Sequence, residues 1–99
     1  ALLAAQLDRL DGLGFDVIHH GVGDLLAAGA LPLAALDTIS VHRLDPSRVA
    51  RVVRSVAAAC AGVGIPLLGG ETAEVPELLR EGAIDLHATL IGQAPNEAA

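Results

Sequence analysis

The stretch "LDPSRVARVVRSVAAACAGVG", residues 44–64, constrains the fold more than any other part of the chain. Asp45 is a typical helix cap, Pro46 suits the first helical position, and Gly62 or Gly64 is expected to end the helix. The apolar residues that recur on one side of this helix are Val49, Val52, Val53, Val56 and Cys60. A helix with one apolar stripe buries that stripe, so we predict that it packs against a sheet.

The segments on either side of this helix predict the remaining elements. Apolar residues spaced by four within residues 17–26 indicate another helix, which ends at Gly29. Three stretches have the pattern of strands: residues 31–41, where the strand is expected to start at Pro32, residues 65–75 and residues 83–94. The second of them runs into a glycine turn. The order α-β-α-β-β predicts an α+β fold, in which a mixed β-sheet carries its helices on one face.

The hydrophobic core must be built almost without aromatic side chains. Apolar residues make up 53% of the 99 residues, and Phe15 is the one aromatic residue. We expect one small domain over residues 1–94 and a loose tail over residues 95–99, and a domain of this size buries little area. The first and last predicted strands are apolar at both alternating sets of positions, which is typical of strands buried on both faces. We therefore expect a homodimer joined through the sheet, with Leu36 and Leu90 in the shared interior.

The charge balance excludes several classes of partner. The formal net charge is −6, and every basic residue is an arginine. Nucleic acid and anionic membrane surfaces both call for clustered positive charge, so neither is expected as a partner. No apolar run reaches the roughly 18 to 20 residues that a membrane-spanning helix needs. A single cysteine cannot form an internal disulfide, so we expect a cytoplasmic protein.

Two short stretches contain candidate ligands. In "HGVGD", Asp24 follows His20 by four residues on one side of the predicted helix, and its carboxylate is a candidate ligand for a hard cation. The alternative is a solvated acid on the outer face of an amphipathic helix. In "GGETAE", residues 69–74, two glycines let the backbone approach a ligand, and Glu71 and Thr72 offer a metal ligand and a hydroxyl. The alternative is a glycine turn capped by polar residues.

The other histidines and the cysteine indicate no further site. His19 and His20 are adjacent, so they point about 100° apart on a helix and cannot chelate one ion. His42 and His87 have no second ligand at the spacing of a metal site, so we expect no zinc site. Cys60 lies on the buried stripe of its helix, where we expect a packed and inert thiol.

Together and in this order, the candidate stretches resemble one enzyme family. "GFDVIHHGVGDLLAAGALPLAALDTISVHRLDP", residues 14–46, and "PLLGGETAEVPELLREGAIDLHATLIG", residues 66–92, are similar to stretches of phosphoribosylformylglycinamidine cyclo-ligase, also called aminoimidazole ribonucleotide synthetase. The most specific part is "GGETAE" with a proline close behind it. The resemblance extends over nearly the whole chain.

The resemblance implies a fold and a role. It implies an amino-terminal domain that binds ATP with magnesium and whose sheet pairs with that of a second subunit to form a barrel. The residues that it assigns to the ATP site are Asp24, Gly69, Gly70, Glu71 and Thr72, of which Asp24 and Glu71 face magnesium. Asp37 matches a family acid that we interpret as structural, because it would end a strand and bond nearby backbone. The implied activity is ATP-dependent closure of formylglycinamidine ribonucleotide to aminoimidazole ribonucleotide in purine biosynthesis, and no catalytic residue is assigned.

Departures from the family pattern bear on this activity. Gly23 stands where the family has asparagine, Thr38 where it has tyrosine, and Glu77 where it has glycine. The family's "DGVGTK" phosphate loop would end just upstream of Ala1, and no lysine replaces its lysine. We expect that these 99 residues do not include the family's carboxy-terminal domain. We therefore expect the 99 residues alone to be inactive, as a fragment of the enzyme. The alternative is a truncated or divergent relative that acts as a dimerisation or regulatory module.

Overall fold

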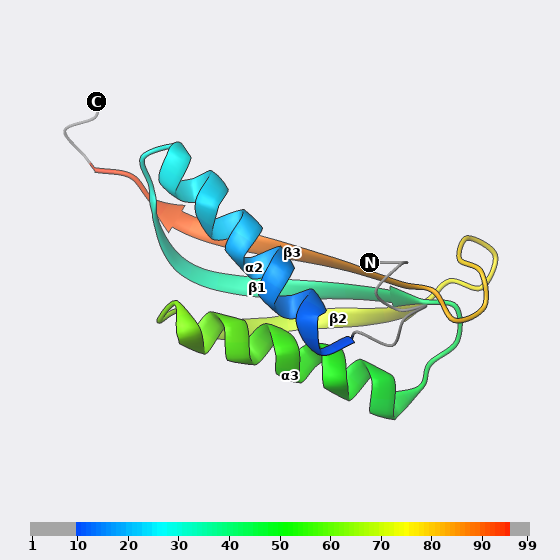
Figure 1. Cartoon of the computed structure of the whole chain (residues 1–99). Helices are drawn as coiled ribbons and strands as arrows, with labels where there is room; N and C mark the ends of the chain where they lie inside the picture. Colours follow the sequence, from blue (N-terminus) through cyan, green and yellow to red (C-terminus); the bar gives the residue numbers. More distant parts are fainter. Residues whose placement is uncertain (1–9, 96–99) are drawn as a thin grey trace.

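The computed structural model describes residues 10–95 as two helices and a sheet. Its elements are α2 (Leu10–Ala27), β1 (Leu31–Val41), α3 (Pro46–Gly62), β2 (Leu67–Glu74) and β3 (Ile84–Gln93). Figure 1 shows both helices on the same side of the sheet, as predicted. The first nine residues of the expected domain and residues 96–99 of the expected tail lie outside the described residues. Neither described helix is long and apolar enough to span a bilayer.

The sheet is mixed, with β1 at its centre. The strand order is β2-β1-β3, with β2 parallel and β3 antiparallel to β1. Parallel neighbours require a crossover connection, and α3 supplies it between β1 and β2. The prediction of a mixed sheet with helices on one face is therefore confirmed.

Helix α3 begins and ends where its local signals indicate. The Asp45 carboxylate accepts hydrogen bonds from the backbone amides of Ser47 (3.1 Å) and Arg48 (3.4 Å), and Pro46 opens the helix. The helix ends at Gly62, and Gly64 follows with a φ of 76°, a left-handed conformation that glycine adopts without strain. Both glycines that the sequence offers are thus used at this end.

The two helices approach each other closely at one glycine. The Gly14 amide donates a hydrogen bond of 2.6 Å to the Ser55 Oγ, and a Cβ at Gly14 would overlap the backbone of Ser55 and Val56. A glycine here brings the two helix backbones together, so α2 and α3 cover the sheet as one layer.

The face of the sheet beneath the helices holds the core. Alternate β1 residues are buried there, including Ala35, Ile39 and Val41, and they pack with Val52 and Val56 of α3. Strand β3 contributes Ile84 and Leu86 to the same cluster.

No helix among residues 10–95 covers the opposite face of the sheet (Figure 1), which we call the open face, and its centre is polar. Thr38 is exposed between its buried neighbours in β1, and His87 and Thr89 are exposed in β3. Within one chain only one face of these strands is buried, and the middle of the other face carries polar side chains. Leu90 is also on the covered face, because it packs against the core and its Cδ1 lies 2.7 Å from where a Cβ on Gly21 of α2 would be.

Candidate functional site

The "GGET" residues lie within a strand and not in a turn. Strand β2 continues through Gly69, Gly70, Glu71 and Thr72 to Glu74, so the expected glycine turn is wrong. The register with β1 shifts after Ala35, so that β2 has one residue more than β1 at this point. This extra residue forms a β-bulge, and the two glycines that follow it are suited to the bent backbone of such a strand.

Three polar side chains lie abreast on the open face of the sheet. Thr38 of β1 is paired in register with Glu71 of β2 on one side and with His87 of β3 on the other. Paired residues of neighbouring strands point to the same face and lie about 5 Å apart, so a carboxylate, a hydroxyl and an imidazole form a polar row. The His87 Nε2 lies 2.9 Å from the Asp85 Oδ2 on the same strand. We call Glu71, Thr38 and His87 the polar row.

Sequence reasoning found Glu71 but missed the other two members of the polar row. In the sequence, Thr38 stands out only as a departure from the family pattern, and His87 has no second ligand at metal-site spacing. The available signal was the alternation of polar residues at every second position, Thr38 and Ser40 in one strand and Asp85 and His87 in another. Alternation assigns residues to a face, but the register that sets Thr38 beside Glu71 depends on pairing between distant segments.

The polar row is suited to binding a polar ligand at the sheet edge. Glu71 lies on an edge strand, whose outward backbone N–H and C=O groups have no strand neighbour among residues 10–95. A carboxylate next to such groups can hold a hard cation or accept hydrogen bonds from a ligand. Thr72 is exposed but is paired with Ile39, so it is directed to the other face of the sheet and does not join the row.

Asp24 lies apart from this strand. Its side chain is 73% exposed on α2, and its Oδ2 is 3.5 Å from the Nε2 of His20, as the spacing of four predicts. Helix α2 packs against α3, β1 and β3 but does not contact β2. The structure therefore does not bring Asp24 and Glu71 together within one chain.

Asp37 lies in the middle of β1 and is buried, so the expectation that it ends a strand is wrong. Only 6% of the residue is exposed, and its Oδ2 has no hydrogen-bond partner. The carboxylate lies over Gly70, where a Cβ would overlap both it and the Asp37 carbonyl. Burial raises the pKa of Asp37. The close contact explains why β2 has glycine opposite this acid.

The thiol of Cys60 is near Asp37 and is buried, as expected from the helix stripe. It is 1% exposed. Burial and the nearby Asp37 charge both raise the pKa of this thiol, which disfavours the reactive thiolate.

His19 and His42 make local contacts that are separate from the polar row. His19 packs edge-on against Phe15, with ring centroids 3.8 Å apart. The His42 Nδ1 lies 2.6 Å from the Leu79 carbonyl oxygen, so this nitrogen carries the donated proton. Within residues 10–95, no three side chains of His, Cys, Asp or Glu lie close enough to hold a metal ion.

Comparison with known proteins supports one family. The cyclo-ligase of Limosilactobacillus reuteri (phosphoribosylformylglycinamidine cyclo-ligase) is 41% identical over 96 residues, which are 97% of this chain and 28% of that protein. The chain thus spans less than a third of this relative's length.

Solved structures of two other proteins share the fold at 26% identity. Thiamine monophosphate kinase from Aquifex aeolicus matches with a TM-score of 0.68 over 84% of this chain and 27% of its own. The hydrogenase maturation protein HypE, solved in complex with ATP, matches with a TM-score of 0.71 over 86% of this chain and 25% of its own.

The family model for AIR synthase related proteins, N-terminal domain, matches residues 2–94. This match includes both helices, the whole sheet and the polar row. The chain therefore belongs to the family of AIR synthase related proteins, as their N-terminal domain.

Proposed function

We propose that this chain is the ATP-binding part of a phosphoribosylformylglycinamidine cyclo-ligase, which closes formylglycinamidine ribonucleotide to aminoimidazole ribonucleotide in purine biosynthesis. The observation that carries the proposal is the identity to a curated cyclo-ligase along almost the whole chain. The same observation favours this function over an inactive dimerisation or regulatory module.

ATP with magnesium is proposed to bind at the edge formed by Gly69, Gly70, Glu71 and Thr72. Two features support this location: Glu71 is exposed beside free strand-edge backbone, and the structurally similar HypE has been solved with ATP. Glu71 supplies an oxygen ligand of the kind that magnesium prefers. Asp24 is the second proposed magnesium ligand. Within one chain it lies on α2, which does not contact β2, so we propose it independently of Glu71 and its contribution is tested separately.

We also propose a homodimer in which the open face of the sheet pairs with that of a second copy. Several large apolar side chains of the strands are exposed, namely Leu31, Leu33, Leu68 and Ile91, with exposures from 44% to 67%. Leu36 is half-buried and alternates with the covered residues of β1, so it belongs to the open face. A second copy would cover these side chains, whereas Leu90 is already beneath α2 and would not contribute.

The test of the ATP site is calorimetric titration of the chain with magnesium and ATP. We expect Glu71→Gln to weaken binding at least tenfold, because a charged ligand to the metal is lost. The matched control is Glu77→Gln, which removes the same charge from an exposed loop position and should change the affinity less than twofold. Asp24→Asn is the third variant, with an expected loss similar to that of Glu71→Gln.

Two results would contradict the assignment. Equal affinities for Glu71→Gln and Glu77→Gln would remove Glu71 from the site. Unchanged affinity in Asp24→Asn would leave Asp24 as a solvated helix acid, the alternative that the spacing allows.

A further inference from the structure

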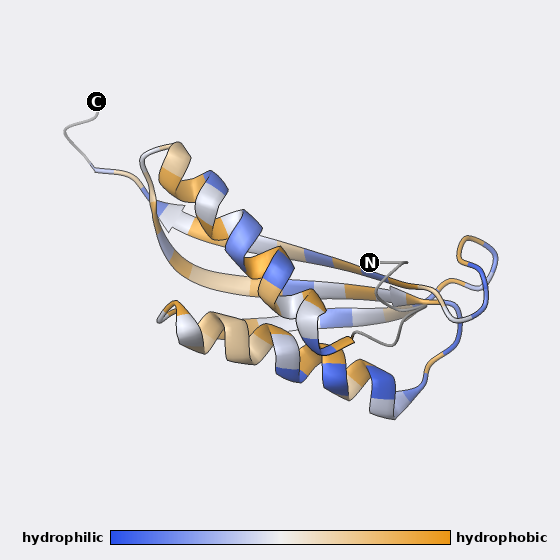
Figure 2. Cartoon of the chain, viewed as in Figure 1, coloured by the Kyte–Doolittle hydropathy of each residue, from blue (hydrophilic) through white to orange (hydrophobic). Residues whose placement is uncertain are grey.

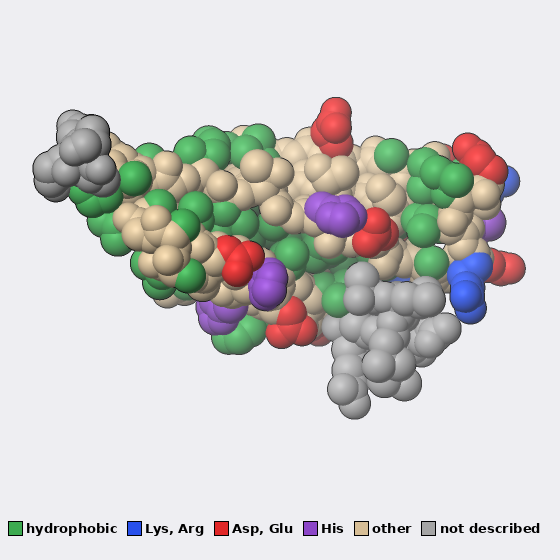
Figure 3. Space-filling model, turned by 90° about the horizontal axis from the view of Figure 1, so that it is seen from above, with side chains coloured by type: hydrophobic (Ala, Val, Ile, Leu, Met, Phe, Trp, Pro, Cys, Tyr) green, Lys and Arg blue, Asp and Glu red, His purple; other side chains and the backbone are tan. Residues whose placement is uncertain are grey.

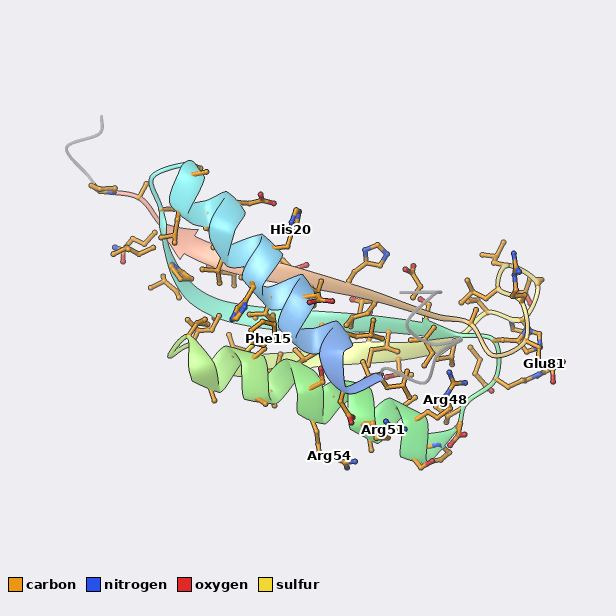
Figure 4. The ribbon with its side chains drawn as sticks, in the orientation of Figure 1. Phe15, His20, Arg48, Arg51, Arg54 and Glu81 are labelled. Carbon is orange, nitrogen blue, oxygen red and sulfur yellow. The ribbon has the colours of Figure 1, made fainter. Side chains whose placement is uncertain are left out.

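A cavity of about 480 Å³ lies at the end of the sheet where β1 and β2 finish. It is lined by His42, Arg43, Arg48, Glu81, Gly82 and Ala83. These residues come from the loop after β1, the first turns of α3 and the turn before β3. Figure 4 shows Arg48 of α3 and Glu81 at this end. The carboxyl edge of parallel strands is the place where open α/β sheets bind ligands.

The cavity carries an excess of positive charge in an acidic chain. It is lined by two arginines and a histidine against a single carboxylate, while the whole chain has a formal charge of −6. Figure 2 shows hydrophilic residues along the amino-terminal part of α3, and the arginines visible in Figure 3 lie at this same end. No ion pair joins Arg43, Arg48 or Glu81 to another residue of the described range 10–95. Two guanidinium groups that line one cavity repel each other, and an anion between them would remove that repulsion.

Hydrogen bonds already hold two of the basic side chains. The Arg48 Nη2 donates to the Gly82 carbonyl oxygen at 3.1 Å, which ties the guanidinium to the far wall of the cavity and leaves its other N–H groups for a ligand. The His42 ring is fixed by donation to the Leu79 carbonyl oxygen. Because the Asp45 carboxylate already binds the first amides of α3, an anion here would depend on the side chains.

We propose that this cavity binds the phosphate group of a small phosphate monoester. Guanidinium groups bind phosphate oxygens in pairs of parallel hydrogen bonds, and two of them from separate elements define a pocket for one phosphate. The volume is within the range of about 300 to 1,000 Å³ found for small-molecule sites, which leaves room for the group esterified to the phosphate. The site is independent of the proposed ATP site, since it uses neither Glu71 nor magnesium.

The experiment is a titration of the chain with inorganic phosphate and, separately, with glycerol 3-phosphate, without magnesium or nucleotide. Binding is followed by NMR at the Arg43 and Arg48 side-chain N–H groups and the His42 amide, with sodium chloride of equal ionic strength as the reference. We expect saturable shifts at these residues with both ligands. Tighter binding of glycerol 3-phosphate would place its alcohol part in the cavity, and equal binding would place only the phosphate there.

Two variants with the same change of charge make the test specific. Arg43→Gln removes an exposed guanidinium that has no partner in the described structure, so the fold should persist while the dissociation constant rises at least tenfold. Arg54→Gln is the control, because Arg54 points away from the sheet in Figure 4. This variant should change the dissociation constant for phosphate less than twofold. Glu71→Gln should leave phosphate binding unchanged. The proposal is overturned by the absence of saturable shifts, or by equal losses in Arg43→Gln and Arg54→Gln, which would indicate only a diffuse charge effect.

Discussion

The covered and open faces of the sheet share one backbone but are built from different chemistry. In β1 the residues under the helices are Ala35, Asp37, Ile39 and Val41, all less than 10% exposed. Thr38 and Ser40 point the other way, toward Glu71, His87 and Asp85 of the neighbouring strands. Hydrophobic burial therefore supports the fold on one face, and the other face remains available for binding a ligand or a second copy of the chain.

The largest expected effect on stability comes from replacing one buried residue of β1 with alanine. Ile39→Ala removes a fully buried side chain and should lower the free energy of unfolding by about 2 to 5 kcal/mol. Thr38→Ala, at the adjacent position on the open face, should change it by less than about 0.5 kcal/mol. Urea denaturation at low protein concentration measures both. A similar loss in the two variants would mean that the Thr38 side chain is packed within the single chain, contrary to its exposure on the open face.

A smaller effect is expected where the two covering helices touch. Gly14→Ala places a methyl group into the backbone of α3 and should destabilise the fold by about 1 to 3 kcal/mol. Gly23 is in the same helix with nothing within 4 Å of an added Cβ, so Gly23→Ala should stabilise by about 0.5 to 1 kcal/mol. Thermal denaturation of both variants checks the sign. If both shift stability the same way, the helices are not packed as closely as the structure shows.

Asp37, the buried acid on the covered face of the sheet, predicts that stability depends on pH. Burial raises the pKa of Asp37, so the folded chain holds this proton at pH values where the unfolded chain has lost it. The free energy of unfolding should therefore fall as pH rises from the ordinary pKa of aspartate through the raised folded value. Asp37→Asn removes this fall. The free energy of unfolding of the variant, relative to that of the natural chain, should therefore rise between about pH 4 and pH 7. Urea denaturation across this range measures it, with Asp16→Asn, an exposed acid of α2, as the control. A constant difference between Asp37→Asn and the natural chain would contradict the burial of an ionisable carboxyl.

Much of the fold could be predicted because its signals are local. The cap at Asp45, the stripe ending at Cys60 and the stop at Gly62 all lie within α3 itself. The strand expected to start at Pro32 likewise matches β1, which begins one residue earlier at Leu31. These features depend on neighbours a few positions away, which a sequence displays directly.

The candidate site was predicted less well because its contacts are distant. Glu71 and His87 meet at Thr38 only after two segments far apart in sequence pair with β1. The need for glycine at position 70 comes from the Asp37 carboxylate on another strand, so the sequence alone predicts a turn at "GG" although the two glycines lie in a strand. Alternation indicates a face, but it does not indicate which residues become neighbours.

The central place of β1 also affects the order in which the chain can assemble during synthesis. Of the strands within residues 10–95, β1 emerges first, then β2 after α3, and the antiparallel partner β3 comes last. Until β3 has left the ribosome, one edge of β1 has no described partner, and the long separation between the two strands makes their pairing a late event. A nascent chain of this kind exposes an apolar strand edge for longer than a simple hairpin would, which makes it a candidate for chaperone binding while it is being translated.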